Sequence, residues 1–164
     1  MKKYLTLSNI LACVAFVLAV VAFAMMFTDQ LFVEVKSILG NGTATVTFSD
    51  AFFSDGGSPI GFIGYLLVLV GGIVAVLLSC PAFLKKKNQR ALAIACASLL
   101  VIVGGVLILL EASLVNSNTG AKNWNIGTLV SGSSYQLTVT AVLGGVFGIV
   151  SGLLSCAGGF LAKK

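Results

Sequence analysis

Four long apolar runs, separated by polar segments, dominate the sequence. They cover about residues 10–27, 60–84, 91–110 and 137–161, and none contains Lys, Arg, Asp or Glu. About 20 apolar residues suffice for a helix to cross a membrane. The runs are continuous, whereas the strands of a transmembrane barrel alternate lipid-facing and lumen-facing residues. The pattern therefore predicts an all-α integral membrane protein, a four-helix bundle formed by a single domain over residues 1–164.

The composition supports this prediction. Of the 164 residues, 58% are hydrophobic and 9% are charged, whereas soluble domains carry roughly 25% charged residues. The mean hydropathy of +1.08 is correspondingly high. These values exclude a soluble enzyme, a nucleic-acid-binding domain and a disordered tail, and they make the lipid bilayer the first expected partner.

The positions of the charged residues predict the topology. Eight of the ten basic residues lie at the two ends of the chain or in the turn 85–90, with no acidic residue among them. All five acidic residues lie in or beside the segments 28–59 and 113–135, together with two lysines. Basic residues favour the cytoplasmic side, so we expect cytoplasmic termini, a cytoplasmic turn and two outer loops. The net charge of +5 then divides into +8 inside and −3 outside, and it requires no nucleic-acid partner.

The first apolar run shares features with a secretory signal. Two lysines precede it, and Ala22-Phe23-Ala24 resembles a cleavage site with small residues. However, the run has about 18 residues, more than the 7–15 of a typical signal. We expect the first helix to be retained, with cleavage as the alternative, in a multi-pass protein of the cell membrane, specifically a bacterial cytoplasmic membrane.

The second and fourth runs contain an internal repeat. Residues 70–80 and 146–156 are identical at eight of eleven aligned positions, including a Ser-Cys pair that hydrophobicity alone does not require. The simplest interpretation is two duplicated helical hairpins. The short turn 85–90 predicts that the second and third helices are antiparallel neighbours.

Small residues recur at helical spacing in the repeated runs. Such residues on one helix face let another backbone approach closely, which is a main source of helix association in lipid. We predict that the two faces are packing surfaces, either within one bundle or as a seam between copies. Both faces have residues spaced four apart: Gly144, Gly148 and Gly152 on the last helix, and Gly71, Ala75 and Ser79 on the second.

The membrane-spanning runs offer little chemistry. The chain has no histidine, so a Ser-His or Cys-His catalytic device is impossible, and no ionisable side chain typical of coupled transport lies within a run. Glu111 directly follows the third run; it could ring the outer mouth of an oligomeric pore or lie as a helix-end carboxylate at the head groups. The four cysteines lack the close spacing of a zinc site. We predict no catalytic, cofactor-binding, nucleotide-binding or metal-binding residues.

The outer loops hold the remaining candidates. Residues 31–35 and 43–48 flank Gly40-Asn41-Gly42, a signal that predicts a small extracellular β-hairpin in the first loop. Phe52 and Phe53 are too apolar for a bare loop and are expected to contact the membrane interface or a partner. Trp124 of the second loop is expected to be an interfacial anchor, with a recognition contact as the alternative.

The order of spans and loops resembles that of the claudin-type tetraspan proteins, with both ends inside and a longer first outer loop that contains strands. The likeness concerns this plan alone: the first loop has neither the tryptophan-rich motif nor the cysteine pair of those proteins, so no residue role carries over. From the residues we predict a non-enzymatic structural or assembly subunit that associates with itself or with a larger membrane complex. A subunit of an oligomeric pore or channel is the second hypothesis, and an accessory or immunity-type membrane protein is the third.

Overall fold

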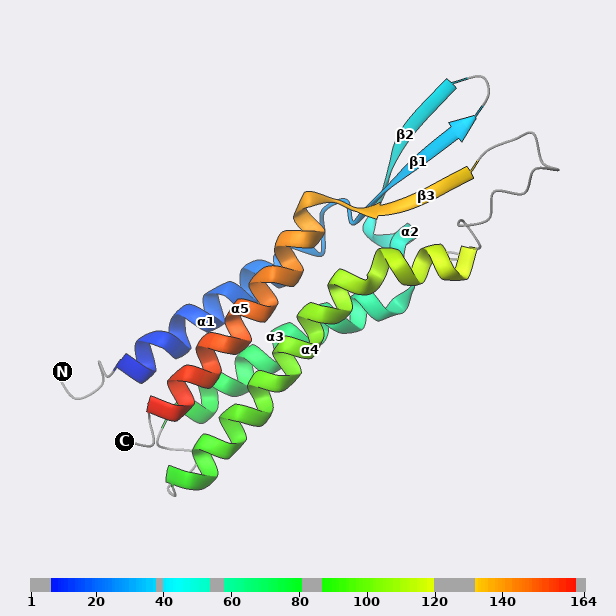
Figure 1. The fold of residues 1–164 in the computed structure, drawn as a ribbon. Helices are drawn as coiled ribbons and strands as arrows, with labels where there is room; N and C mark the ends of the chain where they lie inside the picture. The colour runs from blue at the N-terminus through cyan, green and yellow to red at the C-terminus, as the bar shows by residue number, and fades with distance from the viewer. Residues whose placement is uncertain (1–6, 38–39, 54–57, 81–86, 120–131, 162–164) are drawn as a thin grey trace.

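The computed structural model describes a mostly helical protein over residues 7–37, 40–53, 58–80, 87–119 and 132–161. Within these ranges, four helices are long and apolar enough to span a membrane, which indicates a multi-pass membrane protein. They lie side by side in one bundle, in which α4 packs against α3 and α5 while α1 contacts the other sides of the same two helices (Figure 1). The four are α1 (Leu7–Met25), α3 (Pro59–Ser79), α4 (Lys87–Thr119) and α5 (Val139–Leu161).

A small antiparallel sheet extends from one end of the bundle (Figure 1). Its strands are β1 (Leu31–Ser37), β2 (Gly40–Val46) and β3 (Gly132–Leu137), in the order β2-β1-β3. A short helix, α2 (Phe48–Phe53), follows β2 and contacts α3. Two antiparallel strands were expected in the first loop, but Gly40-Asn41-Gly42 is not the turn between them: these residues belong to β2 and pair with Ser37, Lys36 and Val35 of β1. The third strand comes from the segment that precedes the last span and was not expected.

The helices differ from the apolar runs at their ends. Helix α3, the second predicted span, ends at Ser79, short of the predicted residue 84. Cys80, which follows it, has an extended backbone with φ −74° and ψ 127°. Pro81 explains this, because a proline disfavours the helical conformation in the residue before it. Helix α4, the third predicted span, continues beyond the predicted residue 110 to Thr119, since its carboxyl-terminal end packs against β3.

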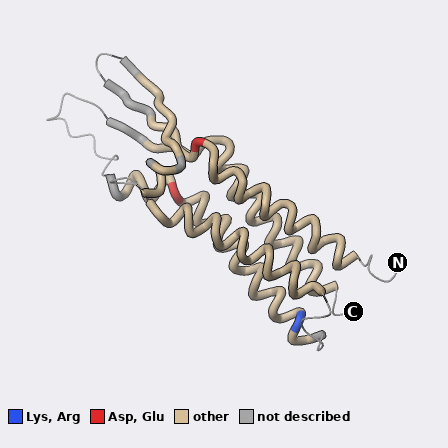
Figure 2. Tube along the Cα trace, turned by 180° about the vertical axis from the view of Figure 1, so that it is seen from behind, with Lys and Arg blue, Asp and Glu red and all other residues tan. Residues whose placement is uncertain are grey.

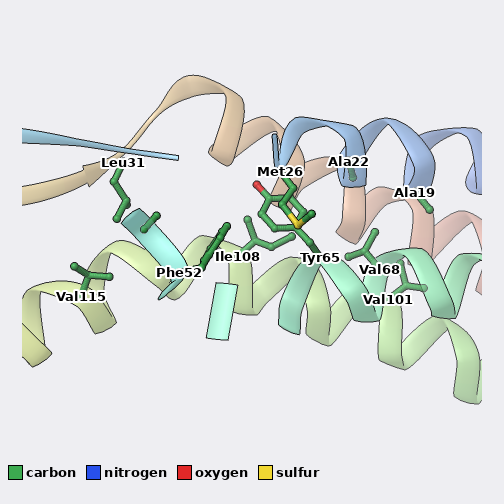
Figure 3. Packing of buried hydrophobic residues seen from close by; sticks show 11 residues of the cluster. Ala19, Ala22, Met26, Leu31, Phe52, Tyr65, Val68, Val101, Ile108 and Val115 are labelled. Carbon is green, nitrogen blue, oxygen red and sulfur yellow. The ribbon is translucent and has the colours of Figure 1, made fainter. Parts of the chain in front are cut away.

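Small residues line the inside of the bundle, and larger apolar residues cover its outside. On α1, Ala15 and Ala19 are buried, whereas Val14 and Val17 are about half exposed. This distribution is expected for helices in lipid, where close backbone packing rather than burial of large side chains holds helices together. Larger buried side chains are concentrated toward the sheet end of the bundle, around Tyr65 (Figure 3).

Two successive glycines place α4 in close contact with both of its neighbours. A β-carbon at Gly104 would lie 2.6 Å from the backbone oxygen of Gly64 on α3. A β-carbon at Gly105 would lie 2.7 Å from the backbone oxygen of Gly145 on α5. The backbones of three helices therefore approach one another at this level, which only residues without a side chain permit.

Candidate functional site at the junction of bundle and sheet

Gln30 joins the end of α1 to the start of β1. Its side-chain amide nitrogen lies 2.8 Å from the backbone oxygen of Met25, 3.0 Å from that of Met26 and 2.8 Å from that of Thr28. The last carbonyls of a helix have no partner within the helix. Gln30, which is completely buried, therefore caps the carboxyl end of α1 and fixes the direction in which the chain enters the sheet.

Tyr65 of α3 binds the side-chain oxygen of the same amide. Its hydroxyl donates a hydrogen bond to Oε1 of Gln30 over 2.8 Å, and both side chains are fully buried. Figure 3 shows Tyr65 and Met26 among the buried side chains at this end of the bundle. Gly144 of α5 gives the ring its space, because a β-carbon there would lie 3.0 Å from the tyrosine hydroxyl. The bond thus ties the α1–β1 corner to α3.

Thr138 connects β3 and α5 to the same corner. Its backbone N–H donates to the oxygen of Gln30 over 3.0 Å, and its hydroxyl donates to the oxygen of Asp29 over 2.6 Å. The same hydroxyl accepts a hydrogen bond of 3.2 Å from the N–H of Ala141, so Thr138 also caps the first turn of α5. Two segments more than one hundred residues apart in the chain are thereby joined by short polar contacts.

Asn116 of α4 attaches the sheet from the other side. Its Nδ2 donates to the backbone oxygen of Tyr135 over 2.8 Å, and its Oδ1 accepts from the N–H of Tyr135 over 2.9 Å. The amide therefore bonds β3 as a neighbouring strand would. Together with Gln30 and Thr138, it connects the sheet to the helices by hydrogen bonds at several points, which restrains its orientation relative to the bundle.

Glu111 of α4 lies next to this junction, and its side chain points into the interior of the protein. It is completely buried, and neither carboxylate oxygen has a hydrogen-bond partner among the described residues. A β-carbon at Gly61, in the first turn of α3, would collide with Oε2 of Glu111 and would lie 2.7 Å from the ring of Phe52 on α2. The structure thus places the Glu111 side chain beside the first turn of α3 and Phe52 of α2. A position at a pore mouth or among head groups would require the side chain to leave this site.

We expect replacement of Glu111 with methionine to stabilise the protein. A buried carboxyl group without a hydrogen-bond partner costs about 1–3 kcal/mol, and a methionine of similar length removes that cost. Thermal unfolding in detergent would measure the change, with Glu111→Gln as the control that keeps the shape and a polar head. A lower unfolding temperature for Glu111→Met would show that the carboxylate has a partner and would contradict this expectation.

The aromatic candidates divide between the inside and the outside of the chain. Phe52 is buried, with its ring centroid 6.3 Å from that of Tyr65 and 6.2 Å from that of Phe62. Phe53 is 60% exposed and contacts the edge of Phe62. Of this pair, Phe53 is therefore the side chain placed to touch lipid or a partner. Trp124 lies outside the described residues.

The small-residue faces lie against helices of the same chain. A β-carbon at Gly148 would be 2.9 Å from Val68 of α3, and one at Gly152 would be 2.5 Å from Ile102 of α4. On α3, Gly71 faces Val101 of α4 in the same way. A second copy could reach these glycines only by displacing α3 or α4. Of the remaining members of these faces, Gly144 contacts Tyr65, Ala75 is buried, and the Ser79 hydroxyl bonds the oxygen of Ala75.

The residues that build the junction were not singled out from the sequence. Thr138 had a usable signal, because a threonine directly before a helix is a common N-cap. Gln30 and Asn116 had no such signal in the sequence. The hydrogen bonds of a single amide side chain depend on which segments the fold places beside it. No family model matches the sequence, and no match was found among curated proteins.

Proposed function

We propose that this protein is a non-enzymatic assembly subunit of a membrane, which presents its three-stranded sheet as a fixed contact element. One observation carries the proposal: buried or part-buried hydrogen bonds from Gln30, Asn116 and Thr138 hold the sheet to the helices. A loop that served only to connect two membrane-spanning helices would need no hydrogen bonds that fix it to the bundle. A restrained element loses less conformational freedom on binding, which favours recognition.

The charges support an orientation with the sheet on the outer side and the termini in the cytoplasm. In Figure 2, the described acidic positions lie toward the sheet, and the described basic position lies toward the opposite end of the bundle. These are Asp29 and Glu111 near the sheet and Arg90 at the start of α4. The positive-inside rule then favours a cell membrane, in our proposal that of a bacterium, with the sheet exposed to the exterior.

The contacts of the helices favour assembly through the sheet over assembly through glycine faces. The close approaches of Gly148 and Gly152 are already made within one chain. The pore hypothesis relied on Glu111 at a mouth, and burial of that side chain gives it no support. An accessory role would use the same outer contact element with a different membrane protein as the partner.

We expect the purified protein to form a defined complex, measured by native mass spectrometry after extraction in mild detergent. The mass should be a multiple of the 16.8 kDa chain or that chain with a fixed partner. Asn116→Ala should weaken the complex several-fold because it releases β3 from α4, whereas Ser117→Ala, at an exposed neighbouring position, should leave it unchanged. Single chains without any partner over a wide concentration range would contradict the proposal.

A further inference from the structure

The two edges of the sheet differ. At the β3 edge, the backbone N–H and C=O of Tyr135 are both bonded to the Asn116 side chain, over 2.9 Å and 2.8 Å. These groups point away from β1, because a residue of an antiparallel strand directs both of its backbone groups to the same side. Helix α4 therefore occupies the outer edge of β3 at this position, and another strand cannot pair there without displacing Asn116.

Among the described residues, no strand pairs with the outer edge of β2. Val33 of β1 stands between Tyr135 of β3 and Ala44 of β2. Since Tyr135 turns its backbone groups toward α4, Val33 directs its own toward Ala44. The alternation along an antiparallel strand then leaves the N–H and C=O groups of Thr43 and Thr45 on the outer side of β2, and both threonines are exposed.

The sequence of β2 lacks the features that usually protect an edge strand. Natural edges carry charged residues, proline or bulges that prevent pairing with another chain. β2 reads Gly-Asn-Gly-Thr-Ala-Thr-Val, with no charge and no proline, while the central β1 carries both Glu34 and Lys36. An uncharged strand does not repel a copy of itself, and opposed threonines form favourable cross-strand pairs.

We propose that β2 binds β2 of a second copy of this chain, as an antiparallel pair that joins the two sheets into one. The inference rests on the proposed function above and names the contact that the assembly uses. Pairing centred on Ala44 would set Thr43 opposite Thr45 of the second copy. The interface is isologous, and because α4 occupies the β3 edge, strand pairing stops at two chains.

The direction of the strands determines how the two bundles are arranged. The two-fold axis that relates an antiparallel pair lies perpendicular to the strands. The strands extend away from the end of the bundle (Figure 1). The two bundles therefore point in opposite directions, as they do when two copies reside in facing membranes.

The test is a proline at the open edge. Thr45→Pro removes an N–H that makes no bond with any of the described residues. It should therefore lower the dimer fraction in detergent at least tenfold and leave the unfolding temperature close to that of the wild type. Thr45→Val is the matched control, because it keeps the N–H and the preference for strand. Thr45→Lys is a second variant at the same position, which lies opposite Phe32 of β1 rather than opposite Glu34. It retains every backbone group and adds a charge to both of the facing strands; it should also reduce dimer formation.

Cross-linking and vesicle clustering complete the test. In a chain with its four cysteines replaced by alanine, a mixture of Thr43→Cys and Thr45→Cys chains should form the mixed disulfide in preference to either homodimer. Vesicles that carry the wild-type protein should cluster, and those with Thr45→Pro should not. A dimer that survives both Thr45→Pro and Thr45→Lys would overturn the β2 contact while leaving an assembly role intact. A wild-type dimer without vesicle clustering would overturn the facing arrangement, and a monomeric wild type would refute both the contact and self-assembly.

Discussion

Replacing Gly105 with leucine is expected to disrupt the helix bundle. A β-carbon at this position would lie 2.7 Å from the oxygen of Gly145 and 2.9 Å from the nitrogen of Ile149. Both are backbone atoms of α5, so the strain cannot be relieved by rotating a side chain. Overpacking of a core costs about 1–3 kcal/mol even where neighbours can adjust, and here α4 and α5 must separate along their contact. We therefore expect a loss in the free energy of unfolding at or above the upper end of this range, about 3 kcal/mol or more.

The measurement is the fraction of protein that stays folded in detergent after heating, followed by gel filtration and by circular dichroism. Val106→Leu is the matched control, because the next residue on α4 is 40% exposed and its extra methylene group would extend into lipid or detergent. This control should unfold at the wild-type temperature. A folded Gly105→Leu protein with an unchanged unfolding temperature would show that α4 and α5 do not make this close approach.

The glycine contacts illustrate what the sequence could predict about packing. The four-residue spacing of Gly144, Gly148 and Gly152 predicted a face for close helix contact. It could not identify the neighbour, because a second copy and a helix of the same chain both require small residues. Only the placement of the helices shows that Val68 and Ile102 of the same chain occupy the space beside these glycines.

Hydropathy predicted the spans better than their ends. Four uncharged apolar runs were enough to indicate four membrane-spanning helices, and the structure contains four helices of that kind in its described ranges. The third run ends where polar residues begin, yet α4 continues through Asn116 because that residue contacts β3 instead of lipid. Hydropathy measures suitability for lipid and carries no information about a helix end that packs on a sheet.

The sheet and the Glu111 site depend on contacts between distant segments. β3 is a polar stretch whose pairing partner, β1, lies about one hundred residues earlier in the chain. Glu111 follows an apolar run, a position that predicts an exposed carboxylate at the head groups. Its burial results from Gly61 and Phe52, which belong to elements that sequence spacing alone cannot bring to its side.

Replacing Gln30 with leucine is expected to destabilise both the bundle and the sheet. The change removes the hydrogen bonds to the oxygens of Met25, Met26 and Thr28, and it leaves the buried hydroxyl of Tyr65 without its acceptor. Two of these bonds are buried, the one to Met26 and the one from Tyr65. Each buried polar group left without a partner costs about 1–3 kcal/mol, so we expect a total loss of several kcal/mol in the free energy of unfolding. Gln136→Leu, on an exposed part of β3, is the matched control and should have little effect.

A double-mutant cycle with Tyr65→Phe separates the shared bond from the other contacts of Gln30. Tyr65→Phe alone should cost less than Gln30→Leu, because it leaves only one oxygen of the amide without a donor. In the double variant the unsatisfied hydroxyl is absent, so the combined loss should fall below the sum of the single losses by about 1 kcal/mol or more. Hydrogen exchange should also accelerate in β1 and β3 of Gln30→Leu, since both strands begin or end at this corner. Additive losses in the free energy of unfolding would exclude a bond between the two side chains. Unchanged hydrogen exchange in the strands would limit the role of Gln30 to capping α1. It would also remove the main support for a sheet held fixed by the bundle.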